Sequence, residues 1–330
     1  MIRAIADGEV VTEAGAYRMS MDWYHGQDVC PGPSISSSGL RKIVMESEWH
    51  FWMSWTGNPN RYPDKEPGDG LVLGKAAHCL LLGDEVFDDL FIYVPKDAPR
   101  RPTATQIAAF ERDGKWSDAA APGASFWAEF DKKAAGRLLL TDEQVQKIGY
   151  MAENLRRNPL ATEMLTGGMT EVSMVWQDPI TGVWLKSRPD VIPDNGADFA
   201  DLKTFAPQKH DIARAAQSAI TDHAYHMQMA LATMGAEAVL GTTATECVLV
   251  MCQTTAPYTV TPVRLDEEAL YLGRVMIRHG IDRFARCLET GVWPMPVEDV
   301  LTYTIPPSIS GRLYEMQGDG RLPYLERTTA

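Results

Sequence analysis

The sequence has few cysteines and no long hydrophobic segment. Its five cysteines are widely spaced and include no CxxC pair. This argues against a zinc ribbon or a four-cysteine cluster and is typical of reduced, buried thiols in a cytosolic protein. No apolar run approaches the roughly 18 residues of a membrane span, and residues 1–20 lack the apolar stretch of a signal peptide. We therefore expect a cytoplasmic protein with no membrane partner.

Basic residues are also scarce. The 31 Lys and Arg residues against 44 Asp and Glu residues give a net charge of -13. This excess favours solubility and argues against a surface covered with non-specific nucleic-acid contacts, although it leaves room for a local basic channel. With 330 residues, of which 45% are hydrophobic and 23% charged, the chain has the composition of one large globular domain or two modest ones. Disordered, collagenous and disulfide-scaffold classes are excluded.

The order of predicted elements indicates an α/β fold. Serines at 34–38 precede a helical segment, and helices are also predicted at 71–82, 103–114, 141–165, 207–219, 222–239 and 266–288. Strands are predicted at 91–95, 171–176, 183–192, 197–205, 246–253 and 258–265, with a loop at 116–125. We expect a three-strand meander over 171–205 within one central mixed β-sheet flanked by helices, and a helical N-terminal elaboration.

The chain is divided accordingly into three parts. We predict an N-terminal extension at 1–33, a single domain at 34–295 with its core at about 168–265, and a C-terminal tail at 296–330. The tail is rich in Pro, Gly and aromatic residues, so we expect it to pack on the body or to reach a neighbouring subunit.

Three residues form the clearest chemical pattern. Asp190 ends the segment WLKSRPD, and Asp201 and Lys203 lie in FADLKTF. Residues i and i+2 of a strand point to the same side, so Asp201 and Lys203 would face one site with Leu202 turned to the core. The turn at 193–196 would fold Asp190 back beside them. Two carboxylates at a sheet edge suit Mg²⁺ or Mn²⁺, and a lysine there can orient a water for phosphodiester hydrolysis.

Each of these residues also has a simpler explanation. An Asp-x-Lys pair in an exposed strand is commonly a solvated ion pair, and an aspartate at a turn is ordinary. The combination of two acidic strand ends with a lysine at period two favours a catalytic site over a solvated pair.

These residues resemble the signature of the PD-(D/E)xK nuclease superfamily, with Pro189-Asp190 and Asp201-Leu202-Lys203 in SRPDVI and DFADLKT. The segment GKAAH at 74–78 resembles the GxxxH helix of the RecB-like branch, and YHMQ at 225–228 resembles its Gln/Tyr motif. The segment SISSSGLRKIV at 34–44 resembles the start of RecE-type exonucleases (exodeoxyribonuclease VIII) and their phage relatives. The resemblance spans about residues 20–295 and implies a restriction-endonuclease-like core.

The resemblance implies roles for the matching residues. Asp190 and Asp201 would be metal ligands, with the Leu202 carbonyl as a possible further ligand, and Lys203 would position the attacking water. His78 would ligate a second metal ion, although a core histidine on an apolar helix explains it equally. Two Mg²⁺ or Mn²⁺ ions are implied. An iron–sulfur cluster is not expected, because the cysteine spacing of cluster-containing relatives is absent.

Three further residues are candidates for supporting roles. Glu171 would add an acidic group, or it is a surface glutamate at a strand end. Tyr225 and Gln228 are three residues apart, so they share a helix face. In the family they support the site and the DNA strand; alternatively they form a polar helix face.

Several basic groups are candidates for phosphate contacts, and Arg41 and Lys42 are the DNA-binding candidates that we assign. The others are Arg100-Arg101, Lys132-Lys133 with Arg137, and Arg156-Arg157, each of which is also typical of a solvated face. The resemblance implies a homo-oligomeric ring with a basic channel for linear double-stranded DNA, which reconciles DNA binding with the acidic charge. Trp49, Phe51, Trp52 and Trp55 would stack on an end base or pack the helix on the body.

The sequence and the resemblance together predict a metal-dependent exonuclease that degrades linear duplex DNA from 5′ to 3′ in phage-type recombination or end resection. A single-strand annealing protein would use the product. Two alternatives stay open: an endonuclease of the same superfamily with a restriction or repair role, and a catalytically inactive DNA-binding protein on the same fold.

Overall fold

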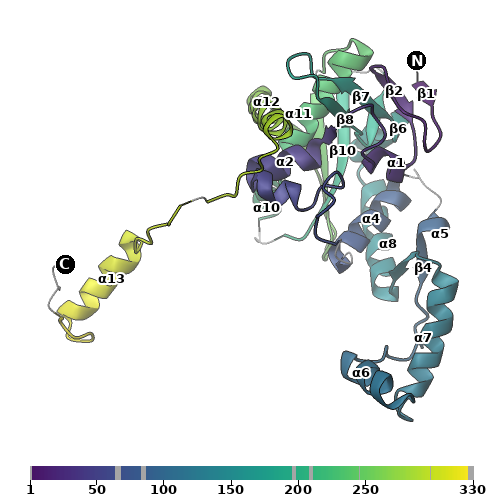
Figure 1. The fold of residues 1–330 in the computed structure, drawn as a ribbon, viewed down its shortest axis with the longest axis vertical. Helices are drawn as coiled ribbons and strands as arrows, with labels where there is room; N and C mark the ends of the chain where they lie inside the picture. The colour runs from purple at the N-terminus through teal and green to yellow at the C-terminus, as the bar shows by residue number, and fades with distance from the viewer. Residues whose placement is uncertain are drawn as a thin grey trace.

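The structure is a computed structural model that describes residues 2–63, 68–82, 87–194, 198–207, 211–244, 246–297 and 299–325. Figure 1 shows a body from which two parts protrude. One is an arm that contains α6 (Ala104–Asp113) and α7 (Ala121–Ala134), and the other ends in the C-terminal helix α13 (Pro307–Gly318). Within these residues, no helix is long and apolar enough to cross a membrane.

Across the described residues, the strands form two five-stranded sheets and one two-stranded pair. The first sheet has the order β1 (Ile2–Ala4), β2 (Gly15–Arg18), β7 (Ser173–Gln177), β8 (Trp184–Ser187) and β3 (Ser34–Ser36). The second has the order β12 (Val260–Leu265), β11 (Glu246–Gln253), β10 (Asp198–Phe205), β9 (Val191–Pro193) and β6 (Gly168–Thr170). Strands β4 (Phe91–Tyr93) and β5 (Leu138–Leu140) pair at the base of the arm.

The α/β fold class is confirmed, but the expected meander within one central sheet is wrong. Strands β7 and β8 are antiparallel in the first sheet, whereas β9 and β10 are antiparallel in the second. The chain crosses between the sheets at residues 188–190, where Pro189 has no N–H to continue a ladder. The N-terminal elaboration is not purely helical either, because it supplies β1, β2 and β3 to the first sheet.

The second sheet is buried on both faces, and side chains alternate between them along β10. Phe199 and Phe205 belong to the large core that includes α2 (Ser37–Met45), α10 (Ile212–Asp222), α11 (Tyr225–Gly235) and α12 (Glu267–Thr290). Ala200 and Leu202 belong to a second core with α4 (Asp69–Leu82), α8 (Asp142–Arg156) and α9 (Pro159–Thr166). A π-helix, η1 (Ala236–Leu240), continues α11.

Most predicted helices and strands are present with shifted ends. Helices α4 and α6 and strand β4 match their predicted segments, and α10 to α12 match theirs within a few residues. Two predictions were wrong. The expected loop at 116–125 contains the start of α7, whose first turn includes Pro122. The expected single helix at 141–165 breaks at Asn158, which caps α9, and Pro159 begins that helix.

Three short helices complete the described secondary structure: α1 (Met21–His25), α3 (Glu48–Trp52) and α5 (Phe87–Leu90). The aromatic cluster of α3 packs on the body. Trp52 stacks on Trp293 with ring centroids 4.6 Å apart, and Phe51 and Trp55 both contact Phe284 edge-on. These contacts support the packing role of the cluster rather than stacking on a DNA end.

Candidate active site

The crossover between the two sheets places Asp190 beside β10. Its side chain is buried, and its Oδ2 accepts a hydrogen bond of 2.6 Å from the backbone N–H of Leu202. The Oδ1 lies 2.8 Å from Nε2 of His78. His78 belongs to α4, which covers the face of the second sheet opposite to α11. The predicted proximity of Asp190 to the 201–203 segment is therefore present, although residues 195–197 of the expected turn lie outside the described residues.

Asp201 and Lys203 share the side of β10 that faces α11, as the period of two predicts. Asp201 is fully buried, and its Oδ2 forms an ion pair with Nζ of Lys203. Its Oδ1 accepts a 2.9 Å hydrogen bond from Nε2 of Gln228. The ring of Tyr225 lies 5.3 Å from Nζ of Lys203, so both predicted supporting residues of α11 reach the same carboxylate–lysine pair.

The two carboxylates differ in their electrostatic environment. For Asp190, burial acts to raise the pKa, but His78, the charge of Lys203 and the Leu202 N–H together outweigh burial, and the pKa is lowered. For Asp201, burial and the charge of Asp190 raise the pKa to about 6 despite Lys203. Burial acts to lower the pKa of Lys203, yet the two carboxylates hold it above its usual value, so the lysine is charged. The site therefore brings two carboxylates together in a desolvated place, where each needs a cationic partner.

The same carboxylates raise the pKa of His78. Burial acts to lower it, but Asp190 prevails in charge and hydrogen bonding and raises the pKa to about 9. In this arrangement His78 is a charged partner of Asp190 rather than a neutral ligand.

A cavity of about 1150 Å³ opens beside this cluster. His78, Lys203, Tyr225, Glu171 and Leu202 are among its lining residues, together with residues at the base of the arm. Gly74 of α4 makes the close approach possible, because a Cβ there would lie 2.9 Å from Oγ1 of Thr204. The two aspartates lie behind this wall, and each pairs with one of its residues: Asp190 with His78 and Asp201 with Lys203.

Glu171 lies at the cavity wall but not in a strand, contrary to the prediction. Its φ is +54°, a left-handed conformation that is uncommon outside glycine. Its Oε2 forms an ion pair of 3.1 Å with Nη1 of Arg188, whose Nε and Nη2 donate to Ser173 Oγ and the Met19 carbonyl. Arg188 thus fixes Glu171 and the crossover. Sequence reasoning did not identify Arg188, although an arginine directly before Pro-Asp was visible.

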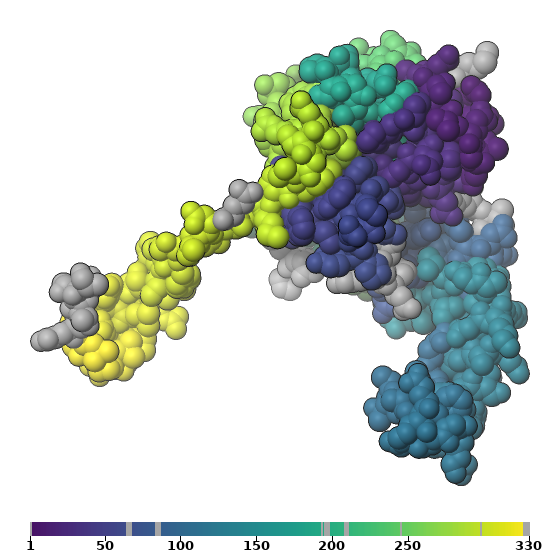
Figure 2. Space-filling view, in the orientation of Figure 1, coloured from purple at the N-terminus to yellow at the C-terminus, as the bar shows by residue number. Residues whose placement is uncertain are grey.

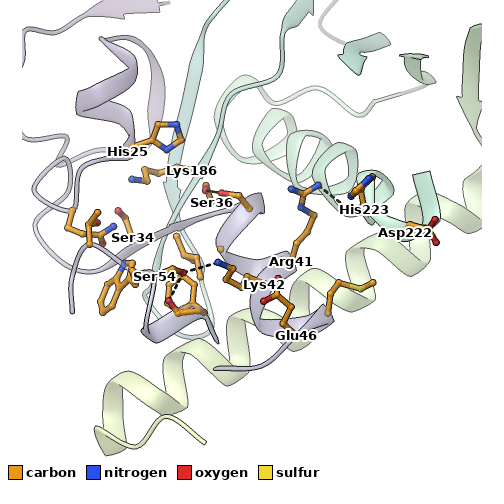
Figure 3. A pocket seen from close by; sticks show the side chains of 18 residues that line it. His25, Ser34, Ser36, Arg41, Lys42, Glu46, Ser54, Lys186, Asp222 and His223 are labelled. Carbon is orange, nitrogen blue, oxygen red and sulfur yellow. Dashed lines mark hydrogen bonds between the residues drawn. The ribbon is translucent and has the colours of Figure 1, made fainter. Parts of the chain in front are cut away.

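Arg41 and Lys42 line a second cavity of about 480 Å³ (Figure 3). Nη1 of Arg41 donates a 2.8 Å hydrogen bond to the His223 carbonyl, and its guanidinium lies 5.6 Å from the Tyr225 ring. Nζ of Lys42 lies 3.1 Å from Oγ of Ser54. Because Tyr225 contacts both Arg41 and Lys203, the second cavity adjoins the carboxylate cluster.

Sequence reasoning missed two further residues of this second cavity. Nζ of the buried Lys186 donates to the carbonyls of Tyr24 and Gly26, at 2.6 and 3.0 Å, and burial lowers its pKa to about 8. The hydroxyl of Ser34, which is 1% exposed, has no hydrogen-bond partner among the described residues. A lysine directly after two apolar residues of a predicted strand was the available sequence signal for Lys186.

Two of the other candidate arginines form ion pairs outside the cluster. Arg101 pairs with Asp131 and stacks on Trp127 at 4.0 Å within the arm, and Arg157 pairs with Glu153. Arg137 donates to backbone carbonyls and lines the larger cavity. All five cysteines are buried.

The donor set suits a divalent cation in its chemistry. Two buried carboxylates whose mutual repulsion raises the pKa of Asp201 would gain from a cation between them. Over the described parts of the chain, however, no three His, Cys, Asp or Glu side chains are already arranged to hold a metal ion. His78 would have to exchange its hydrogen bond to Asp190, and Lys203 its ion pair to Asp201, before a metal ion took those oxygens.

The fold and the Asp190–Asp201–Lys203 cluster are those of the PD-(D/E)xK class. Residues 36–302 match the family described as a PDDEXK-like domain of unknown function (DUF3799), and the chain belongs to this family. The superfamily resemblance of the sequence is thereby confirmed, and together with the cluster it supports a nuclease.

Two solved structures are similar to the chain at low identity. A candidate exonuclease from Eubacterium rectale is 14% identical with a TM-score of 0.48, covering 83% of this chain and 91% of that chain. A phage-related exonuclease from Haemophilus somnus 129PT is 13% identical with a TM-score of 0.30, covering 58% of this chain and 92% of that chain. No curated protein matches the chain at a significant level.

Proposed function

We propose that the protein is a metal-dependent exodeoxyribonuclease that hydrolyses phosphodiester bonds of linear double-stranded DNA from 5′ to 3′. One observation carries the proposal: Asp190 and Asp201, both buried, converge beside Lys203, which lines a large cavity. Such an arrangement has little value for stability, because it holds two carboxylates of like charge out of water. Its chemistry fits phosphodiester hydrolysis.

Each residue of the cluster has a definite task in this proposal. Asp190 and Asp201 would hold one or two Mg²⁺ or Mn²⁺ ions, with the Leu202 carbonyl and His78 as further ligands; the metal supplies stabilisation of negative charge on the reacting phosphate. Lys203 holds its ammonium beside Asp201 and orients the attacking water. Gln228 fixes the Asp201 carboxylate through its 2.9 Å hydrogen bond, and Tyr225 supports Lys203.

The second cavity supports action at a DNA end. It offers Lys186, Arg41 and Lys42 beside the Ser34 hydroxyl, for which the described residues provide no hydrogen-bond partner. Together these groups suit a terminal phosphate. It adjoins the carboxylate cluster through Tyr225. A 5′-phosphate held there would place a nearby phosphodiester in the larger cavity. This geometry favours an exonuclease over an endonuclease.

The biological role follows as part of the same proposal. Degradation from the 5′ end leaves a 3′ single strand for homologous recombination or end resection of the phage type, where a single-strand annealing protein would bind. A homo-oligomeric ring around the duplex would keep the enzyme on its substrate. The acidic net charge of -13 would then lie on the outside of the ring.

A digestion assay with Mg²⁺ tests the activity. Linear duplex labelled at its 5′ or its 3′ end is compared with a closed circle, using the wild type, Lys203→Ala and Lys115→Ala, an exposed lysine of the arm, as the matched control. We expect early release of the 5′ label, an intact circle, an inactive Lys203→Ala and an unaffected Lys115→Ala. Cleavage of the circle would favour the endonuclease, and no cleavage of any substrate would favour the inactive DNA-binding protein.

The end-binding role is tested separately. Duplexes with a 5′-phosphate and with a 5′-hydroxyl are digested by the wild type and by Lys42→Gln. We expect the wild type to prefer the phosphate and the variant to lose most of that preference while its turnover on 5′-hydroxyl ends is unchanged. Equal rates on both ends with the wild type would contradict the assignment of the second cavity.

A further inference from the structure

The chain exposes more surface than a compact protein of its size. Its accessible surface is 19639 Å² for 36.6 kDa, whereas a compact monomer of this mass exposes about 13,500 Å². The excess of roughly 6,000 Å² is several times the area of about 800 Å² that one partner buries in a standard interface. Figure 2 shows that the arm and the C-terminal segment stand away from the body, which accounts for the excess.

The C-terminal segment is apolar as well as exposed. Helix α13 has no buried residue, yet Ile309, Leu313 and Met316 follow the i, i+4, i+7 spacing of one helix face. Ile309 is 50% exposed and Leu313 is 39% exposed. The linker before the helix adds Leu301 and Tyr303, both almost fully exposed. Contiguous apolar surface of this kind marks an interaction site.

A matching apolar strip lies on the body, on α12. Tyr271, Leu272 and Val275 are 64%, 47% and 47% exposed, and their spacing places them on one side of the helix. The opposite side of α12 is buried by Ile277 and Phe284. The strip therefore belongs to the part of α12 that faces solvent.

The chain does not bring its own two apolar surfaces together. After α12, Trp293 still packs on the body, and the C-terminal segment then extends away from it (Figure 1). One chain thus carries two exposed apolar helix faces that are separate in space. Two faces of this kind pack well as a helix pair when they come from different copies.

We propose that α13 and the linker residues before it dock on the Tyr271–Val275 strip of α12 of a second copy of this chain. The contact joins two different surfaces, so it is heterologous, and it either closes into a ring or is exchanged reciprocally between two copies. This inference deepens the proposed homo-oligomer by naming its contact, and it is independent of whether the carboxylate cluster cleaves DNA.

Light scattering after gel filtration tests the contact. The wild type is compared with Leu313→Asp, with Val275→Asp and with Ser308→Asp, a control on another face of α13. We expect the wild type and Ser308→Asp to form oligomers, and each of the other two variants to dissociate with at least a 100-fold weaker affinity, because a charge is buried in the contact. Circular dichroism confirms folding, and Leu313 lies outside the body, so its change does not affect the core.

Mixing the two disrupted variants makes the test specific. Val275→Asp keeps an intact α13, and Leu313→Asp keeps an intact α12 strip, so the mixture should form a one-to-one pair although neither variant associates alone. A monomeric wild type, unchanged masses for both variants, or a mixture that stays monomeric would each overturn the proposal. Lys203→Ala should retain the wild-type mass, so failure of the nuclease proposal and failure of this contact are separate results.

Discussion

Replacing Asp201 by asparagine should abolish cleavage and yet stabilise the metal-free protein. Burial and Asp190 raise the pKa of Asp201 from 3.8 to about 6. An acid whose pKa is higher in the folded state favours folding below its unfolded pKa, and this advantage is lost as the pH rises through 6. A pKa shift of about 2 units means that the ionised carboxylate destabilises the folded protein by ~3 kcal/mol at pH 8.

Asparagine removes this cost while its Oδ1 still accepts the hydrogen bond from Gln228. Part of the gain is offset because Lys203 loses its ion-pair partner. We therefore expect Asp201→Asn to raise the free energy of unfolding by about 1–3 kcal/mol at pH 8 in EDTA. Denaturant unfolding measures this value, with Asp97→Asn, an exposed carboxylate of the arm, as the control.

The pH dependence distinguishes this explanation from a general effect of the substitution. The gain should shrink steadily as the pH falls from 8 towards 4, because the wild-type carboxylate becomes protonated in the folded protein. Mg²⁺ should stabilise the wild type and leave Asp201→Asn unchanged. A variant that is less stable than the wild type at pH 8, or a gain that is equal at every pH, would refute the reasoning.

Three further predictions concern other polar contacts, two of them in the carboxylate cluster. Gln228→Ala removes the amide that fixes Asp201, so kcat should fall by about 10–100-fold with little change in KM. An unchanged kcat would contradict the positioning role of Gln228. The raised pKa of His78, about 9, should be visible in an NMR titration in EDTA and should return towards 6.5 in Asp190→Asn. The stability that the His78–Asp190 pair adds is complete below pH 6.5 and is lost as the pH rises through 9. Glu48 of α3 forms an ion pair with Arg283 of α12, which lowers the pKa of Glu48 although burial acts to raise it. Glu48→Gln should therefore lose about 1–3 kcal/mol of stability at pH 7 and much less once the pH falls below the folded pKa. Equal losses at pH 7 and pH 3 would contradict the ion pair.

Local periodicity was sufficient to predict the part of the site that lies on single elements. Asp201 and Lys203 face one side because a strand alternates, and Tyr225 and Gln228 share a face because they are three residues apart on a helix. The helix around His78 was also predicted with nearly its observed ends. These features depend on backbone geometry within one segment, which a single sequence specifies well.

The parts that escaped prediction depend on pairing between distant segments. The strands around Asp190 read as one continuous meander, because nothing in the local sequence says that β8 and β9 join different sheets. Arg188 was missed as a consequence, since its contacts to Ser173 and Met19 exist only when the N-terminal strands complete the first sheet. Lys186 escaped notice for the same reason: its carbonyl partners belong to Tyr24 and Gly26.

The crossover between the sheets also explains why the carboxylates lie where they do. A carboxylate within a regular strand of a sheet that is buried on both faces is enclosed by side chains, as Asp201 of β10 is. Asp190 instead follows Pro189 at the passage between the sheets, where the ladder is interrupted. The partners of the two aspartates, His78 and Lys203, line the adjoining cavity. The interruption leaves Asp190 to accept from the Leu202 N–H and to pair with His78, so one carboxylate at the break in the ladder joins β10 to α4.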